Sequence, residues 1–181
     1  MHRSVLEFGK EVLLPEYCHS KRIIEIGSKD INGSLRPYVE SLKPSEYIGT
    51  DFQPGRGVDK VINVNDLLTE FGKESFDVII STEMLEHCED WKRAIEIMFS
   101  LCKMNGIILL TARGPGFRYH AYPYDYWRFT VKDIEKIFKD NAILHNRKDF
   151  FSPGILSQIQ KTSEIVHIDF DVISIKNGAE K

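Results

Sequence analysis

An acid, a glycine and a polar loop end the first apolar run of this chain. The β-branched run that includes Glu25 stops at Gly27, and Ser28, Asp30 and Asn32 continue it as a loop. A buried parallel strand ends in this way when its loop must hold a ligand. Glycine removes a side chain where a ligand would approach the backbone, and a carboxylate beside a buried strand needs a partner. These residues together predict a ligand site, although a glycine alone is equally typical of a tight turn.

Two further carboxylates follow later apolar stretches. Asp51 ends the second stretch, at about the distance that one strand–helix–strand unit requires, and its carboxylate has the chemistry to bond a ribose diol. Asp66 and Leu67 follow a third stretch. They place a polar group beside an apolar one, as the edge and the face of an adenine ring would need. A nucleotide-type cofactor is therefore the first hypothesis.

Two histidines provide side chains suited to proton transfer near neutral pH. His87 follows a fourth apolar stretch, and His120 lies in the long loop 114–129. Either one is a candidate general base. His87 is equally consistent with a residue that only orders the start of a helix, and for His120 an exposed loop position is slightly favoured. The catalytic role of each histidine therefore stays a hypothesis.

Alternating strand and helix patterns connect these loops. Strands are expected at residues 21–26, 46–51, 60–64, 76–81, 107–111, 142–151 and 165–175. Helices are expected near the N-terminus up to Pro15, and at 33–42, 66–71, 90–102 and 130–138. Residues 152–162 are interpreted as a connection with a helical turn. The alternation predicts an α/β fold with a parallel sheet and helices on both faces, and a ligand site outside the carboxyl ends of the strands.

The strand-end motifs, taken in order, resemble those of the class I S-adenosylmethionine-dependent methyltransferases, in the form of a type 11-like methyltransferase domain. Four segments carry the resemblance, residues 23–27, 47–51, 76–87 and 101–111. It implies a Rossmann-like three-layer sandwich, with a mostly parallel seven-stranded sheet and an antiparallel C-terminal strand. It also implies S-adenosyl-L-methionine as the cofactor and S-adenosyl-L-homocysteine as its product.

The same resemblance assigns each residue on the cofactor side a place around the ligand. Those places are the methionine moiety for Glu25, Gly27 and Glu83, the ribose for Asp51, the adenine face for Phe52, and the adenine edge for Asp66 and Leu67. The usual Gly-x-Gly-x-Gly loop is absent after Gly27. Whether Ser28, Asp30 or Asn32 takes the ammonium or carboxylate of the cofactor is therefore left open, and Asn32 is equally explained as a helix cap.

The segment 111–130 is dense in aromatics and contains three arginines. A loop this long is usually functional or disordered, and its aromatics argue against disorder. Arg113 and Arg128 are candidates to hold an acceptor carboxylate or phosphate, although Arg128 pairs at least as well with Asp125. Tyr124 and Tyr126 either line the acceptor pocket or fix the loop to the domain. The arginine excess modestly favours an anionic small-molecule acceptor.

The bulk composition sets limits on the class of protein. The 181 residues are expected to form a single methyltransferase domain, with an N-terminal helical segment (1–20), a cofactor-binding core (21–151) and a C-terminal strand region (152–181). A net charge of −3 disfavours nucleic acid as a partner, and no apolar run predicts a membrane span. Three scattered cysteines favour the cytoplasm. No residue set has metal-ligand spacing, so no metal is expected.

The resulting hypothesis is transfer of a methyl group to an oxygen or nitrogen of a small polar acceptor, of the sugar, cell-surface or natural-product type. The small size of the domain leaves the acceptor site open or completed by a partner subunit, as in a homodimer. Alternatives are methylation of a protein or nucleic acid, and a non-catalytic cofactor-binding module. Dinucleotide binding ranks below these, because Asp30 would repel a diphosphate at the loop.

Overall fold

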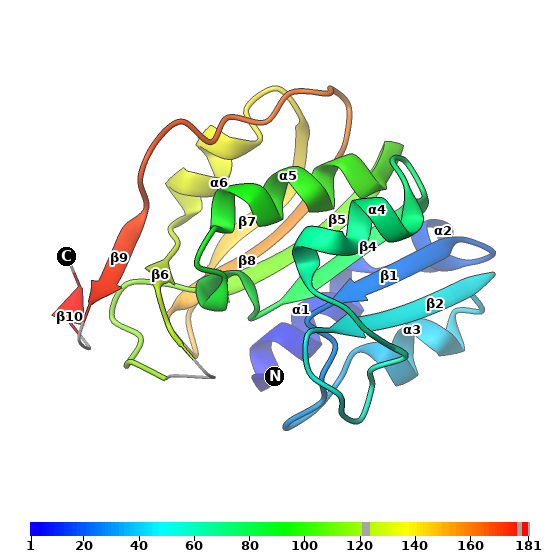
Figure 1. The fold of residues 1–181 in the computed structure, drawn as a ribbon, viewed down its shortest axis with the longest axis horizontal. Coiled ribbons are helices and arrows are strands. Elements are labelled where there is room, and N and C mark those ends of the chain that lie inside the picture. Colours follow the sequence, from blue (N-terminus) through cyan, green and yellow to red (C-terminus); the bar gives the residue numbers. More distant parts are fainter. Residues whose placement is uncertain (121–123, 177–178, 181) are drawn as a thin grey trace.

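The computed structural model describes residues 1–120, 124–176 and 179–180, and these form a seven-stranded sheet between two layers of helices (Figure 1). The strand order is β3-β2-β1-β4-β5-β8-β7. The strands are β1 (Arg22–Ile26), β2 (Glu46–Asp51), β3 (Lys60–Val61), β4 (Phe76–Thr82), β5 (Cys102–Arg113), β7 (Ala142–Asp149) and β8 (Gly154–Gln160). Strands β1 to β5 are parallel to one another, whereas β8 is antiparallel to both β5 and β7. The predicted α/β fold with a mostly parallel seven-stranded sheet is confirmed.

Helices cover both faces of the sheet (Figure 1). An apolar core lies between the sheet and the helices on each face. The helices are α1 (Arg3–Val12), α2 (Pro15–Cys18), α3 (Arg36–Ser41), η1 (Val64–Asp66), α4 (Leu67–Phe71), η2 (Leu85–His87), α5 (Trp91–Leu101) and α6 (Val131–Ile137). Successive strand side chains point to opposite faces. Ile23 of β1 therefore joins the core under α1 and α3, and Ile24 joins the core under α4, α5 and α6. Burial on both faces explains why the central strands are continuous apolar runs.

The position of the antiparallel strand differs from the prediction. It is β8, in the segment 152–162 that was expected to be a connection, and not residues 165–175. Polar residues within β8 conceal the strand in the sequence, yet Ser157 and Gln158 are buried and satisfied. Ser157 bonds Asn146 at 2.9 Å, and the Gln158 amide donates to the Val12 carbonyl at 2.9 Å.

The segment expected to form the last strand belongs mostly to an irregular stretch. Its end contributes β9 (Ile173–Lys176), which joins a small second sheet with β6 (Trp127–Arg128) and β10 (Ala179–Glu180). The backbone N–H of Ile175 donates to the carbonyl of Tyr126. This small sheet therefore anchors the end of the 114–129 loop.

Several expected element ends are confirmed, and one helix is shorter than predicted. Thr130 caps α6, and Asp133 completes a capping box with it, as the sequence predicts. Helix α3 begins only at Arg36, because the Asp30 carboxylate bonds the Gly33 backbone N–H and holds that stretch as a loop. Within the part of the chain that the structure describes, no helix has the length and apolarity to cross a membrane.

Candidate active site

A cavity of about 760 Å³ lies at the carboxyl ends of β1, β2 and β4, where the strand order reverses. Ligands bind at this place in open α/β sheets, and the volume suits a small-molecule ligand. The cavity is lined by twelve of the residues singled out in the sequence. These are Glu25, Gly27, Ser28, Asn32, Asp51, Phe52, Leu67, Glu83, His87, His120, Tyr124 and Tyr126.

The loop after β1 is shaped to bring backbone close to a ligand. Gly27 has a φ of 82°, and a Cβ at this position would lie 2.6 Å from the Cγ of Met84. The backbone N–H groups of Gly27 and Ser28 both donate to the Thr50 carbonyl, which fixes the turn. The Ser28 hydroxyl is buried at the cavity, and no partner among the described residues bonds it. An unsatisfied polar atom at a cavity wall fits a polar ligand group.

Asp51 ends β2 with its carboxylate held at the cavity. One oxygen accepts the Gln53 backbone N–H at 2.9 Å, and the other accepts the Lys29 backbone N–H at 3.3 Å. Each carboxylate oxygen retains a free lone pair for a ligand. Phe52, the next residue, is 53% exposed at the cavity edge, where it has the apolar area to cover a flat ring.

Glu83 is the charged centre of the β4 end of the cavity. It has a φ of 52°, which is uncommon for a residue other than glycine and is typical of functional sites. Burial disfavours its charge, but Arg113 and His2 outweigh burial and hold the pKa of the carboxyl below its ordinary value. The Arg113 guanidinium is fully buried, with Nη2 2.5 Å from the Glu83 carboxylate. Glu83 therefore faces the cavity as an anion.

Glu25 is the opposite case. It is buried, and burial raises the pKa of its carboxyl to about 7, even though the Tyr47 hydroxyl donates a hydrogen bond to it. A neutral carboxyl can donate a hydrogen bond as well as accept one. Near pH 7 the Glu25 carboxyl is therefore partly protonated, whereas the Glu83 carboxyl is ionised.

The raised pKa of Glu25 predicts a pH-dependent gain in stability for Glu25→Gln. The folded state binds the proton more tightly than the unfolded state, whose pKa is near 4.5. The wild-type protein therefore loses stability as the pH rises from 4.5 through 7, by about 3 kcal/mol at most. Urea denaturation should find Glu25→Gln more stable than wild type at about pH 8 and equal to it near pH 4.5. The same difference at both pH values would contradict a buried, neutral Glu25.

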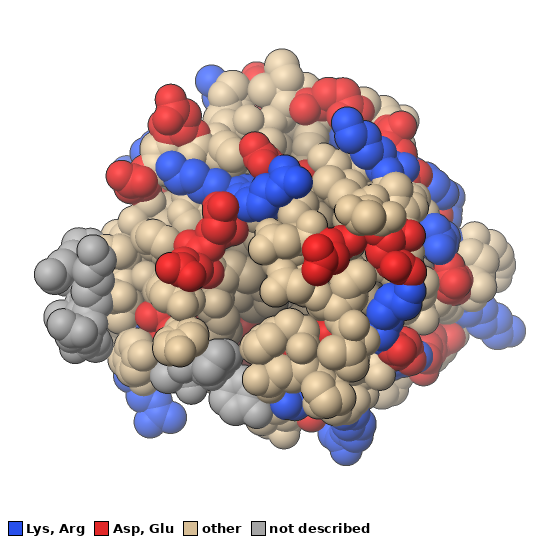
Figure 2. Space-filling model, viewed as in Figure 1, with Lys and Arg blue, Asp and Glu red and all other residues tan. Residues whose placement is uncertain are grey.

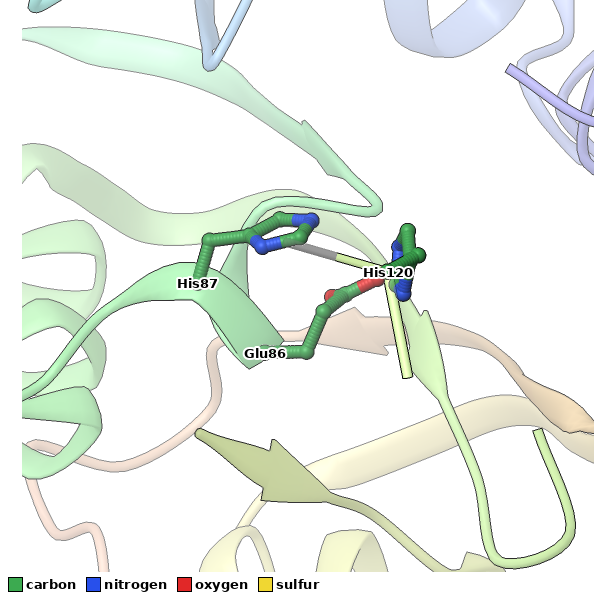
Figure 3. Close-up of side chains that lie close together, drawn as sticks. All are labelled: Glu86, His87 and His120. Atoms are coloured by element: carbon green, nitrogen blue, oxygen red, sulfur yellow. The ribbon is translucent and has the colours of Figure 1, made fainter. Parts of the chain in front are cut away.

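Glu86 and His87, which are adjacent in the sequence, meet the distant His120 on one side of the cavity (Figure 3). One ligand atom of each lies within 4.8 Å of the others. The His87 Nδ1 bonds the Tyr124 carbonyl, and the His120 Nδ1 bonds the Asp125 carboxylate at 3.0 Å. Burial and the neighbouring His87 lower the pKa of His120, against the opposing effect of Asp125. His120 is therefore a neutral base near pH 7, half-buried and not simply an exposed loop residue.

The structure does not bring four of the predicted site residues to the cavity lining. Asp30 pairs with Arg56 and bonds the Gly33 backbone, and Asp66 is exposed outside the cavity. Arg113 and Arg128 are fully buried. An excess of arginines in a segment does not predict the direction of their side chains. Here Arg113 pairs with Glu83, and Arg128 pairs with Asp125.

Arg128 makes the internal pair with Asp125 that the sequence left as an alternative. Both guanidinium Nη atoms bond the Asp125 carboxylate, and the Arg128 side chain also donates to the carbonyls of Phe117 and Arg118. This network organises the described part of the 114–129 loop. Residues 121–123, which that loop prediction included, lie outside the described residues.

Some cavity residues were missed by the sequence reasoning. Met84 packs against Gly27, and His2 bonds Glu83 from the N-terminal segment. Nothing in the local sequence of His2 signals a site, whereas Met84 directly follows Glu83 in the segment 76–87 that carries the family resemblance. The sequence does contain a signal for Glu86. It directly precedes the candidate histidine His87 after a strand, so it is itself a candidate site residue.

The family comparison agrees with this fold. The model of a methyltransferase domain family matches residues 4–147. The chain belongs to this methyltransferase family, and the predicted class I S-adenosylmethionine-dependent methyltransferase domain is confirmed. No curated protein sequence matches the chain significantly.

Solved structures with this fold include methyltransferases of differing chemistry. An S-adenosylmethionine-dependent methyltransferase from Mesorhizobium loti is 14% identical with a TM-score of 0.62, over 84% of this chain and 95% of that one. The 1,6-didemethyltoxoflavin-N1-methyltransferase of Burkholderia thailandensis, solved with S-adenosylhomocysteine, is 11% identical with a TM-score of 0.70, over 88% and 79%. The CurJ carbon methyltransferase is 18% identical with a TM-score of 0.58, over 84% and 51%. At these identities the likeness establishes the fold and leaves the acceptor open.

Proposed function

We propose that this protein transfers the methyl group of S-adenosylmethionine to an oxygen or nitrogen of a small polar acceptor. The observation that carries the proposal is that one cavity joins the Gly27 and Asp51 loops to His87 and His120. The first pair has the chemistry of a nucleoside site, and the second has the chemistry of proton removal. A methyltransferase with a hydroxyl or ammonium acceptor needs both within reach of each other.

On the cofactor side, each polar group of the ligand has a counterpart in the cavity. Asp51 would accept hydrogen bonds from the ribose hydroxyls, with Phe52 against the adenine. Anionic Glu83 would attract the ammonium of the methionine tail, and the unpartnered Ser28 hydroxyl would bond its ammonium or carboxylate. Asn32 lines the same end of the cavity and is the other candidate for that contact. When bound, the cofactor supplies an electrophilic methyl group on sulfur.

On the acceptor side, hydrogen bonds at Nδ1 orient both candidate bases, His120 and His87. The Asp125 carboxylate accepts from the His120 Nδ1, which leaves the lone pair on Nε2. His87 is oriented in the same way by the Tyr124 carbonyl. The rings of Tyr124 and Tyr126, whose centroids are 5.7 Å apart, would cover the acceptor.

The charges at the cavity favour a neutral or cationic acceptor. With Arg113 and Arg128 buried in ion pairs, the preference for an anionic acceptor loses its basis. The lining residues instead include five acids, Glu25, Asp51, Glu83, Glu89 and Asp90, against one lysine, Lys29. An anionic acceptor would enter against their field.

The proposal is tested by a product screen with S-adenosylmethionine and matched neutral, cationic and anionic acceptors, scored by the mass gain of one methyl group. Methylation of neutral or cationic hydroxyl or amine compounds is expected. With an accepted compound, His87→Ala and His120→Ala should reduce turnover by roughly 100-fold, with cofactor affinity little changed. Preferred turnover of anionic compounds would contradict the charge argument, and an equal loss of turnover and cofactor affinity would indicate structural roles for the histidines.

Methylation of nucleic acid is the second candidate and has less support. Figure 2 shows acidic and basic side chains interspersed on one face, without a continuous basic stripe. Phosphate backbones are held mainly by clusters of lysine and arginine. This face therefore does not favour a nucleic-acid acceptor.

We also propose a cytoplasmic location. Cys18, Cys88 and Cys102 are free thiols. Burial raises the pKa of Cys18 to about 11 and of Cys88 to about 12, so these two thiols are unreactive. Free, unreactive thiols are typical of a reducing compartment.

A further inference from the structure

The group formed by Glu86, His87 and His120 is not fully explained by methyl transfer. The Glu86 side chain is completely buried, and neither of its carboxylate oxygens has a hydrogen-bond partner among the described residues. Its ion-pair contact is with the Arg113 Nε at 4.0 Å, but the same guanidinium lies closer to Glu83, at 2.5 Å. A buried carboxylate without hydrogen bonds is costly, and such groups are usually paired or bind a metal.

The two histidines beside Glu86 are arranged as metal ligands usually are. A ligating imidazole typically donates its other ring N–H to a carboxylate or a backbone carbonyl, which fixes the ring and raises its basicity. Both partner types are present here. The His120 Nδ1 bonds the Asp125 carboxylate, and the His87 Nδ1 bonds the Tyr124 carbonyl. Because these oxygens only accept hydrogen bonds, both Nδ1 atoms carry a proton, which leaves Nε2 as the ring nitrogen available to an ion.

We propose that Glu86, His87 and His120 bind one divalent first-row transition-metal ion, with Zn²⁺ as the representative probe. Two imidazoles and one carboxylate form a ligand set of a kind known for Zn²⁺. Three protein ligands leave a coordination position for an outside molecule, as in catalytic zinc sites. His87 and His120 line the cavity, so an ion held by them would be within reach of a molecule bound there.

The three side chains lie farther apart than they would around a bound metal ion. Their ligand atoms lie within 4.8 Å of one another, whereas ligands at ~2.1 Å from a tetrahedral ion are ~3.4 Å apart. Closure by roughly 1 Å lies within the reach of side-chain rotations in His87 and His120, which are only partly buried. Glu86, which is fixed by burial, would be the rigid member of the set.

The site has a consequence for the reaction, and this consequence rests on the proposed function. An acceptor hydroxyl in the open position would have its pKa lowered by the ion. In the metal-bound protein the histidines would assist methyl transfer as ligands, and the role of base proposed for them above would apply to the metal-free protein. Metal binding itself is independent of that function, and it is measured without cofactor or acceptor.

The test is equilibrium dialysis of the wild-type protein against Zn²⁺, followed by metal quantification. One equivalent per chain is expected. Glu86→Gln, His87→Ala and His120→Ala should each weaken the affinity at least about tenfold. His19→Ala is the matched control, because His19 is an exposed histidine outside the cavity, and it should bind as wild type does. Circular dichroism verifies that each variant is folded.

Co²⁺ titration identifies the ligand atoms. Visible absorption bands of a low-symmetry site, without a sulfur-to-cobalt charge-transfer band, are expected. A strong charge-transfer band would place the ion on Cys88, which also lines the cavity, and would overturn the proposal. Binding by wild type no tighter than by the His87→Ala/His120→Ala double variant would overturn it as well. Methyl transfer that persists after the metal has been removed would refute the proposed role of the ion in catalysis. The proposal that the site binds an ion would still stand.

Discussion

Asp51→Ala is expected to weaken the binding of S-adenosylmethionine by about 10-fold to 100-fold. The ribose hydroxyls would lose a charged acceptor, and hydrogen bonds to charged groups contribute about 1.5–3 kcal/mol. Asp51 is suited to this role because two backbone N–H groups, from Lys29 and Gln53, hold its carboxylate in place before the ligand arrives. Isothermal titration of the folded variant measures the loss directly.

Asp66→Ala is the matched control for Asp51→Ala. Both residues are acids that follow short strands, and the sequence assigned both to the cofactor. In the structure Asp51 lines the cavity, and Asp66 is exposed outside it. Cofactor affinity should therefore be unchanged in Asp66→Ala. An equal loss of cofactor affinity in the two variants would support the role that the sequence assigned to Asp66. Unchanged cofactor affinity in Asp51→Ala would show that Asp51 does not contact the cofactor.

Arg113→Leu is expected to reduce the free energy of unfolding by about 3–5 kcal/mol. The Arg113 side chain is fully buried and lies between three acids, with Glu83 at 2.5 Å, Asp149 at 3.8 Å and Glu86 at 4.0 Å. Leucine would fill much of the volume but leave these carboxylates without their shared cation. Urea denaturation near pH 7 measures the change.

Arg147→Ala gives the contrast for Arg113→Leu. Arg147 pairs with Glu11 through both guanidinium Nη atoms, but the two side chains are 45% and 47% exposed. Exposed ion pairs contribute only about 0–1 kcal/mol. A loss for Arg113→Leu as small as that for Arg147→Ala would contradict the central place given to Arg113. Addition of Glu83→Gln to Arg113→Leu should recover part of the loss, because it removes one of the unpaired charges.

The central strands were predictable because their burial on both faces produces apolar runs. The same physics gives the candidate ligand site, since parallel strands bring Gly27, Asp51 and Glu83 to one cavity at the edge of the sheet. Strand β8 was not predictable in this way. Ser157 and Gln158 look like loop residues, and their partners, Asn146 and the Val12 carbonyl, become visible only when distant segments have been assembled.

The acceptor side was less predictable than the cofactor side for a related reason. Its residues lie in a loop, where no periodicity fixes the direction of a side chain. The sequence could not distinguish an Arg128 that reaches for a ligand from one that neutralises Asp125, and the structure shows the second. The meeting of Glu86 with His120 likewise depends on how the loop folds back over η2, which no spacing in the sequence encodes.

The most direct test of the account is isothermal titration of the wild-type protein with S-adenosylhomocysteine and, separately, with NAD. Both ligands carry an adenosine, so the adenine and ribose contacts do not distinguish them. The anionic Glu83 at the cavity favours an ammonium and opposes a diphosphate. We predict one binding site per chain for S-adenosylhomocysteine and none for NAD. Tight binding of NAD, with no binding of S-adenosylhomocysteine, would contradict the assignment of this cavity to methyl transfer.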